Sequence, residues 1–138
     1  MTRRLTLLVI LVTLAMPGCD SSPTDIVGGP LTFEGVLTSD AVDEHSLVIT
    51  KPGGVRIEAL SITADPPLDE GLTPTIGFGF GEPDIEGTCI PSFSANLTEG
   101  INLSLGLDER TYCILVSDNG SILEDTSRTY VIQVRSSE

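Results

Sequence analysis

The chain is poor in the side chains that most catalytic and nucleic-acid-binding sites need. It has no tryptophan, 4 phenylalanines, 2 tyrosines and one histidine, His45. It has 7 basic residues against 20 acidic ones, a formal net charge of −13, so electrostatic repulsion argues against nucleic acid as a partner. Neither a G-x-S-x-G nor a G-x-x-x-x-G-K motif occurs, which leaves a serine hydrolase or a P-loop enzyme unsupported. We therefore expect a non-catalytic protein without a cofactor.

The sequence also lacks an apolar run long enough to span a membrane. The longest run, residues 5–16, has 12 residues, whereas a membrane-spanning helix needs about 20. It follows two arginines and leads into the sequence M-P-G-C, which ends at Cys19. This arrangement resembles the signal peptide and lipobox of bacterial lipoproteins, in which the cysteine receives a diacylglyceryl group. We expect residues 1–18 to be removed and Cys19 to carry the lipid; ordinary signal-peptidase cleavage near Ala15 is the alternative.

The chain after the predicted signal divides into a tether and one domain. Residues 19–30 are small and polar, with several prolines and glycines, which predicts a flexible tether. Residues 31–138 are enough for one domain with a core and too few for two. A lipid on Cys19 would place this domain at the bacterial cell envelope, facing the periplasm or the exterior. It would also hold an acidic protein to a membrane whose anionic headgroups repel it.

Cysteine is scarce, and the two that remain after Cys19 are Cys89 and Cys113. An exported chain meets an oxidising compartment, so we predict a disulfide between them, contributing about 3–4 kcal/mol by chain entropy. Two free buried thiols are the alternative. A zinc site is disfavoured, because the spacing is not C-x-x-C and His45 is the only histidine.

Long amphipathic helices are missing too, and apolar residues alternate with polar ones in short segments separated by Gly, Pro, Asp and Asn. This pattern is typical of an all-β fold, an antiparallel two-sheet β-sandwich or jelly roll. Residues 112–116 and 130–132 are apolar on both faces and should be central strands. A change of phase near Ala59 predicts a bulge that bends its strand between the sheets. The other predicted strands are 31–37, 45–50, 55–63, 76–81 and 101–107.

Two local patterns carry specific expectations. Within residues 76–81, Phe78 and Phe80 alternate with glycines. The bare glycine face predicts either the close approach of another backbone or a pliable edge strand. Residues 117–120, S-D-N-G, form the strongest turn signal in the chain.

The titratable side chains favour structural roles. His45 stands at a strand start, where we expect a capping or surface role. Glu82, Asp84 and Glu86 offer the kind of carboxylate pair that a glycosidase uses, but a solvated acidic loop explains them better. Acidic residues near 40–44, 65–70, 82–86 and 118–119 keep a structural calcium open as an alternative, although none spells an EF-hand loop. Our prediction is that no metal is bound.

Five motifs follow one another along the predicted domain. They are F-E-G-V-L at 33–37, D-E-H-S-L-V-I at 43–49, P-G-G-V-R-I at 52–57, R-T-Y-C-I-L-V at 110–116 and Y-V-I-Q-V at 130–134. In order and spacing they resemble the bacterial pre-peptidase C-terminal domain, here as a stand-alone lipoprotein. Glu109-Arg110 departs from the family pattern, in which a glycine usually precedes the tyrosine strand. The resemblance implies a non-catalytic jelly roll of a kind that binds extracellular polymers or calcium in some relatives.

These observations predict a lipid-anchored β-sandwich that acts as a binding or structural module. Its partners would be the membrane, through the lipid on Cys19, and an unidentified envelope protein that meets its loops or an edge strand. An extracellular polymer, polysaccharide or peptide, is the alternative ligand. Exposed Tyr112, or Phe78 and Phe80 on a concave face, would favour the polymer.

Overall fold

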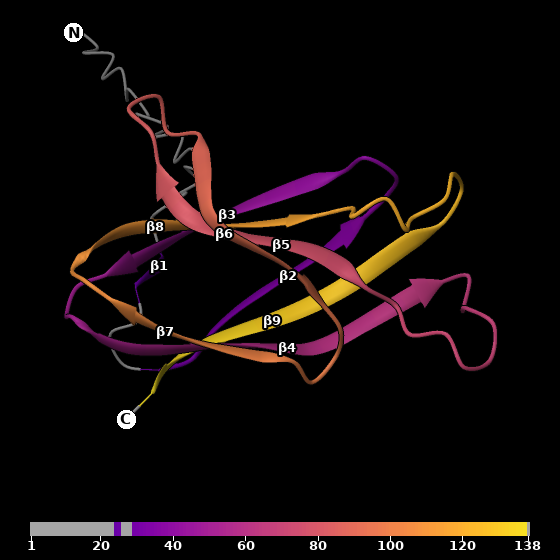
Figure 1. Cartoon of the computed structure of the whole chain (residues 1–138), viewed down its shortest axis with the longest axis horizontal. Helices are drawn as coiled ribbons and strands as arrows, with labels where there is room; N and C mark the ends of the chain where they lie inside the picture. Colours follow the sequence, from indigo (N-terminus) through magenta and orange to yellow (C-terminus); the bar gives the residue numbers. More distant parts are fainter. Residues whose placement is uncertain (1–23, 26–28, 138) are drawn as a thin grey trace, which may run out of the picture.

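The computed structural model describes residues 24–25 and 29–137, and this part of the chain is all-β (Figure 1). The predicted signal, residues 1–18, and Cys19 lie outside the described residues. Within the described ranges, no helix is long and apolar enough to cross a membrane. The strands are β1 (Thr24–Asp25), β2 (Leu31–Leu37), β3 (Val42–Ile49), β4 (Gly53–Asp65), β5 (Ile76–Pro83), β6 (Cys89–Leu97), β7 (Asn102–Leu107), β8 (Arg110–Ser117) and β9 (Ser127–Ser137).

Two sheets pack face to face, one with the order β1-β3-β8-β5-β6 and the other with the order β2-β9-β4-β7 (Figure 1). From β2 to β9 every connection crosses between the sheets except the β5–β6 hairpin, which is the path of a jelly roll. Neighbouring strands are antiparallel, apart from β1, which pairs in parallel with β3. The predicted fold class is confirmed. Two residues of the predicted tether, Thr24–Asp25, form β1 and extend the sheet.

The core lies between the sheets, and the period-two pattern of the sequence explains it. The predicted central strands β8 and β9 each lie between two neighbours, as expected. Each fully buried leucine or isoleucine contributes roughly 1.5–3 kcal/mol through the hydrophobic effect. Such side chains include Leu37, Leu47, Ile57, Ile76, Leu97, Ile114 and Ile132.

Strand β4 carries a bulge at the predicted place. Its register with β9 shifts between Ala59 and Ser61, and Leu60 is the extra residue, 42% exposed. The predicted bend between the sheets is wrong, because β4 pairs with β9 on both sides of the shift. Instead, the bulge allows a contact with a loop. The Ala59 amide donates a hydrogen bond to the Ile101 carbonyl at 3.0 Å and so holds the β6–β7 connection against β4.

The loops that connect the strands lie at the two ends of the sandwich. The chain enters at one end, where Leu31 pairs with Val134. At the far end, where β2 and β4 finish and β9 starts (Figure 1), lie the loops 38–41, 66–75 and 118–126. These three loops contain six carboxylates and no basic residue. The loops at the entry end, 50–52, 84–88 and 108–109, contain four carboxylates and one lysine, so both ends of the sandwich carry acidic loops.

Candidate functional site

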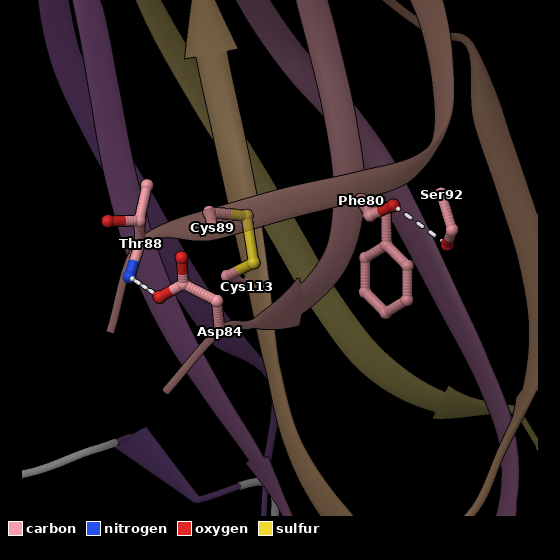
Figure 2. The surroundings of a disulfide bond; sticks show 6 residues. All are labelled: Phe80, Asp84, Thr88, Cys89, Ser92 and Cys113. Atoms are coloured by element: carbon pink, nitrogen blue, oxygen red, sulfur yellow. Dashed lines mark hydrogen bonds between the residues drawn. A yellow bond between two sulfur atoms is a disulfide. The ribbon is translucent and has the colours of Figure 1, made fainter. Parts of the chain in front are cut away.

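Cys89 and Cys113 form the predicted disulfide, with their Cα atoms 5.7 Å apart (Figure 2). Cys113 belongs to the central strand β8, Cys89 begins the edge strand β6, and β5 lies between these strands. Because Tyr112 and Ile114 beside it are core residues, Cys113 points to the outer face of the sheet. The disulfide thus crosses the outer face of β5 and fastens the start of β6 over it.

A glycine makes this crossing possible. A Cβ atom on Gly81 would overlap the backbone carbonyl of Ile90. The register between β5 and β6 also shifts here, between Phe80 and Gly81. Of the two alternatives predicted for the glycine face, close approach of a backbone is correct. The pliable edge strand is wrong, because β5 lies between β8 and β6.

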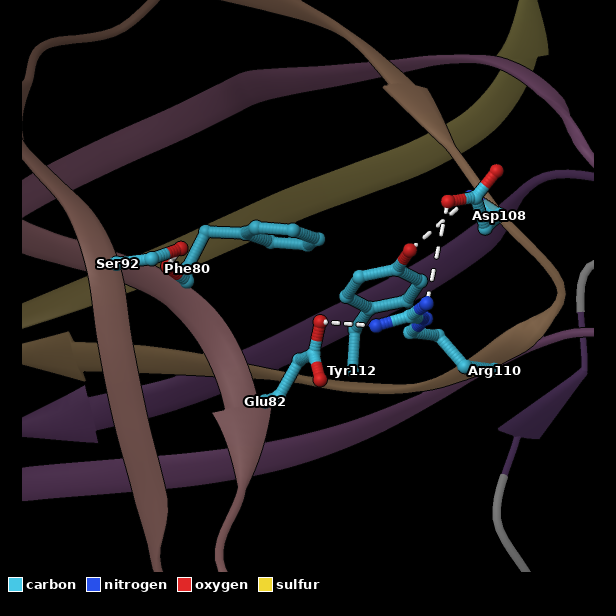
Figure 3. Close-up of polar contacts among 6 residues, drawn as sticks. All are labelled: Phe80, Glu82, Ser92, Asp108, Arg110 and Tyr112. Carbon is cyan, nitrogen blue, oxygen red and sulfur yellow. Dashed lines mark hydrogen bonds and ion pairs between the residues drawn. The ribbon is translucent and has the colours of Figure 1, made fainter.

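The acidic residues beside the disulfide have separate structural roles. Asp84 Oδ1 accepts the backbone N–H groups of Glu86 and Thr88, each at 2.9 Å, and so holds the β5–β6 turn. Figure 2 shows the hydrogen bond from Thr88. Glu82 accepts a hydrogen bond from Arg110 Nη1 at 2.8 Å (Figure 3). This hydrogen bond raises the pKa of the Arg110 guanidinium. Both carboxylates are exposed and lie outside the two recesses of the described residues, which does not favour the cleft that the glycosidase alternative requires.

The aromatic residues proposed as a polymer platform are buried. Phe78, Phe80 and Tyr112 are 2%, 5% and 7% exposed. The rings of Phe80 and Tyr112 stack with centroids 5.2 Å apart (Figure 3), and the Tyr112 hydroxyl accepts the Asp108 N–H at 3.0 Å. Polymer binding therefore loses the aromatic surface on which the sequence-based alternative depended.

His45 is half-buried between the sheets, which corrects the predicted capping or surface role. Its ring stacks on Phe33, with centroids 4.8 Å apart. His45 Nε2 lies 2.7 Å from the Tyr130 hydroxyl, which donates to Asp43 Oδ2 at 2.9 Å. Since the only hydroxyl proton of Tyr130 points to Asp43, His45 Nε2–H must be the donor to Tyr130. The chain of hydrogen bonds joins β3 of one sheet to β9 of the other.

The environment of this cluster sets its protonation. Burial lowers the pKa of His45, although the nearby Asp43 charge opposes the shift. Burial, and then the hydrogen bond to Asp43, raise the pKa of Tyr130. At neutral pH the imidazole is therefore neutral and the phenol protonated. No serine or cysteine takes part in these hydrogen bonds, so the cluster lacks the nucleophile of a hydrolase.

Asp118 organises the strongest predicted turn. Its Oδ1 accepts the backbone N–H groups of Gly120, Ser121 and Ile122 at 2.8, 3.1 and 3.1 Å, and Oδ2 accepts that of Asp40 at 3.1 Å. Burial works against ionisation, but these four hydrogen bonds outweigh it and lower the pKa of Asp118. The Asp118 carboxylate therefore holds the loops 38–41 and 118–126 together at the far end of the sandwich.

A recess of about 420 Å³ lies on the outer face of β5. Gly79 forms its floor, and Pro91 and Leu115 stand on opposite sides. At one end Asn119 Nδ2 donates to Asn96 Oδ1 at 3.2 Å, and the disulfide lies beyond the other end. The residues that line the recess are all uncharged.

The two sheets end on one side in the edge strands β6 and β7, which we call the β6/β7 side. Five consecutive residues of β6 are exposed, and Ile90 and Phe93 are 55% and 41% exposed. Ile101, just before β7, is 39% exposed. Residues 88–107 contain a single charged residue, Glu99. A side with a single charged residue and exposed edge strands is therefore present on a strongly acidic protein, and the sequence did not single it out.

No group of three or more His, Cys, Asp or Glu side chains in the described part of the chain could hold a metal ion. The chain matches no protein-family model and no curated protein. The resemblance to the pre-peptidase C-terminal domain therefore stays a prediction, and its motifs fall on β2, β3, β4, β8 and β9.

Proposed function

We propose that the protein is a lipid-anchored, non-catalytic module of the bacterial cell envelope that binds another envelope protein through the β6/β7 side. One observation carries the choice of surface. A chain with 20 acidic residues has a single charged side chain within residues 88–107, the segment that forms both edge strands. Elsewhere the acidic charge keeps the surface hydrated and repels negatively charged neighbours.

Edge strands explain how such a surface binds protein. Each edge presents unpaired backbone N–H and C=O groups that accept a further strand, and natural proteins usually protect such edges with charged side chains. In β6 the protection is limited to Pro91 and the register shift beside it. Ile90 and Phe93 offer exposed apolar area next to these backbone groups. An extended segment of an envelope protein fits this combination of hydrogen bonds and apolar contact.

The anchor is the second part of the proposal. An exported protein suits the Cys89–Cys113 disulfide, which persists in oxidising compartments. We expect Cys19→Ser to remove lipid labelling and to move the protein from the membrane fraction to the soluble fraction. Labelling with a fatty-acid analogue and fractionation of the producing cells test this. Membrane retention and labelling unchanged in Cys19→Ser would contradict the anchor without bearing on the β6/β7 side.

Crosslinking in the native host, followed by capture and mass spectrometry, tests the binding surface. Phe93→Asp places a charge among the exposed apolar residues of the β6/β7 side and should abolish recovery of the partner. Val36→Asp is the matched control, because Val36 is also an exposed apolar residue, 59% exposed, but lies on the edge strand β2 on the opposite side. Equal loss in both variants, or no loss in Phe93→Asp, would contradict the proposal.

The recess over Gly79 favours the alternative ligand, an uncharged extracellular polymer. Its Asn96 and Asn119 side chains offer amide groups for hydroxyl groups of a sugar, and Pro91 and Leu115 offer apolar contact. Calorimetric titration with soluble envelope polysaccharide tests this alternative. Binding that disappears in Asn119→Ala and persists in Phe93→Asp would favour it over protein binding.

A further inference from the structure

Two arginines lie side by side on the outer face of the second sheet. Arg56 on β4 is registered opposite Arg135 on β9. Both point away from the core, since Val55, Ile57 and Val134 beside them are buried. Like charges directly opposite each other destabilise a sheet unless something balances them. In a chain with 7 basic residues, such a pairing on two central strands calls for a physical reason.

Among the described residues, only one of the two guanidinium groups has an ionic partner. Glu58 Oε2 lies 3.2 Å from Arg135 Nη2 and neutralises that guanidinium. No hydrogen bond or ion pair joins Arg56 to another described residue. Its Nε is buried and without a hydrogen-bond partner. Its two Nη groups have no partner among the described residues either, but they are not buried, so a ligand that supplied acceptor oxygens to them would gain binding energy.

The surroundings leave room for that ligand. Ser104 on β7 is registered opposite Arg56 and offers an exposed hydroxyl. The next residues on this face are Gly54 and Gly106, and a Cβ atom on Gly106 would meet nothing within 4 Å. An oxyanion can therefore approach the guanidinium groups from solvent. Arginine holds the oxygens of such a group in its planar fork, two hydrogen bonds at a time.

We propose that Arg56, Arg135 and Ser104 bind a phosphate-type oxyanion, and that its source is a lipid headgroup. The position of the site in the fold favours a lipid headgroup as the source of the oxyanion. Val134, next to Arg135, pairs with Leu31, the first residue after the predicted tether, so the site lies near the end of the domain that the lipid on Cys19 would hold to the membrane. The headgroup source rests on the proposed lipid anchor, whereas the oxyanion site itself does not.

A nuclear magnetic resonance titration of the isotope-labelled full chain tests the site without requiring the anchor. The first probe is inorganic phosphate, with sodium chloride at matched ionic strength as the reference. We expect saturable shifts of the amide signals in residues 54–58, 103–106 and 133–137. Arg56→Gln should weaken phosphate binding about tenfold, the size of one charge-assisted hydrogen bond. Arg110→Gln, an exposed arginine on the other sheet, should bind like the unmodified protein.

The second probe is dihexanoylphosphatidylglycerol below its critical micelle concentration, which carries the headgroup without forming a membrane. Tighter binding of this lipid than of phosphate, lost in Arg56→Gln, supports the headgroup as the source. Equal binding of the two probes overturns the headgroup source in favour of a free phosphate. Shifts that sodium chloride reproduces, or that persist in Arg56→Gln, overturn the site. Signals elsewhere that stay unchanged in Arg56→Gln show that the variant is folded.

Discussion

Tyr130, at the centre of one sheet, donates its hydroxyl proton to Asp43 on β3 of the other sheet, 2.9 Å away. The same oxygen accepts the hydrogen bond from His45. Gly35 makes room for this contact, since a Cβ atom there would lie 2.7 Å from the Tyr130 hydroxyl. Near β2 and β3 the two sheets are therefore joined by polar side chains as well as by apolar packing.

Removal of that hydroxyl should destabilise the fold without changing its shape. Tyr130→Phe keeps the buried ring but leaves the His45 N–H and an Asp43 oxygen without their partner. We expect a loss of about 1–3 kcal/mol in the free energy of unfolding, the usual penalty for unsatisfied polar groups. Urea denaturation followed by circular dichroism measures it.

Tyr112→Phe is the control for this prediction. Tyr112 is also a buried tyrosine, but its hydroxyl only accepts one backbone N–H, that of Asp108, which is exposed and can bond to water instead. The loss in the free energy of unfolding should therefore be clearly smaller in Tyr112→Phe than in Tyr130→Phe. Equal losses in the two variants would mean that the bridge between the sheets adds nothing beyond an ordinary hydrogen bond.

The histidine of the bridge should make stability depend on pH. Burial lowers the pKa of His45 in the folded protein, so as pH falls the unfolded chain takes up the proton first, near its ordinary pKa of about 6.5. The contribution of neutral His45 is complete above about pH 6.5 and is lost as pH falls from there toward the folded pKa. The urea midpoint should decrease from about pH 7.5 to about pH 5.5, a range in which ordinary carboxylates stay ionised.

His45→Gln isolates this effect, because glutamine can still donate to Tyr130 but does not titrate. Its urea midpoint should change less over the same range. The same decrease in both proteins would assign the pH dependence to other groups. At alkaline pH the dependence of stability on pH has the opposite direction. Because the pKa of Tyr130 is raised in the folded protein, the unfolded chain loses the phenol proton first, near its ordinary pKa of about 10, so the free energy of unfolding falls as pH rises above that value.

The disulfide should stabilise both the whole fold and β6 in particular. Replacing Cys89 and Cys113 together by serine removes a crosslink between residues 24 apart, which costs about 3–4 kcal/mol in the chain-entropy account. Hydrogen exchange should increase most in β6, because the bond fastens its first residue over β5. Uniformly faster exchange in all strands would contradict this local role, while an unchanged urea midpoint would contradict the global one.

Sequence patterns predicted the strands whose two faces differ or are both apolar. β2 shows one buried and one exposed face, and β8 and β9 each contain a segment that is apolar on both faces, residues 112–116 and 130–132, so their positions follow from burial alone. β6 was missed because five of its residues are exposed in succession and Pro91 interrupts it. An edge strand with both faces open leaves no alternation to detect. The bulge at Leu60 was visible as a change of phase, but its partner, the β6–β7 loop, was not.

Polar contacts between distant segments were beyond a sequence pattern. Asp43 and Tyr130 are 87 residues apart, and nothing in either segment indicates that their side chains meet. The pairing of Arg56 with Arg135 depends on the strand order β9-β4 and on the bulge-shifted register, which the sequence does not specify. The Cys89–Cys113 disulfide was predictable, because the sequence predicts export and leaves two cysteines in the domain, which allow one pairing.

The crossing of β6 over β5 should be intolerant of any side chain at position 81. Gly81→Ala would drive a methyl group into the Ile90 carbonyl, so β6 must move away from β5 while the disulfide still holds its first residue. Overpacking of this kind costs about 1–3 kcal/mol, and relief by backbone movement cannot be complete while Cys89 is fixed. Gly106→Ala on β7 is the matched control, because a Cβ atom there meets nothing within 4 Å. We expect Gly106→Ala to leave the urea midpoint nearly unchanged and Gly81→Ala to lower it.

In the double cysteine-to-serine background the effect of Gly81→Ala should shrink, because β6 is then free to shift. A Gly81→Ala loss that is equally large without the disulfide would show that the crossing is held by strand pairing alone.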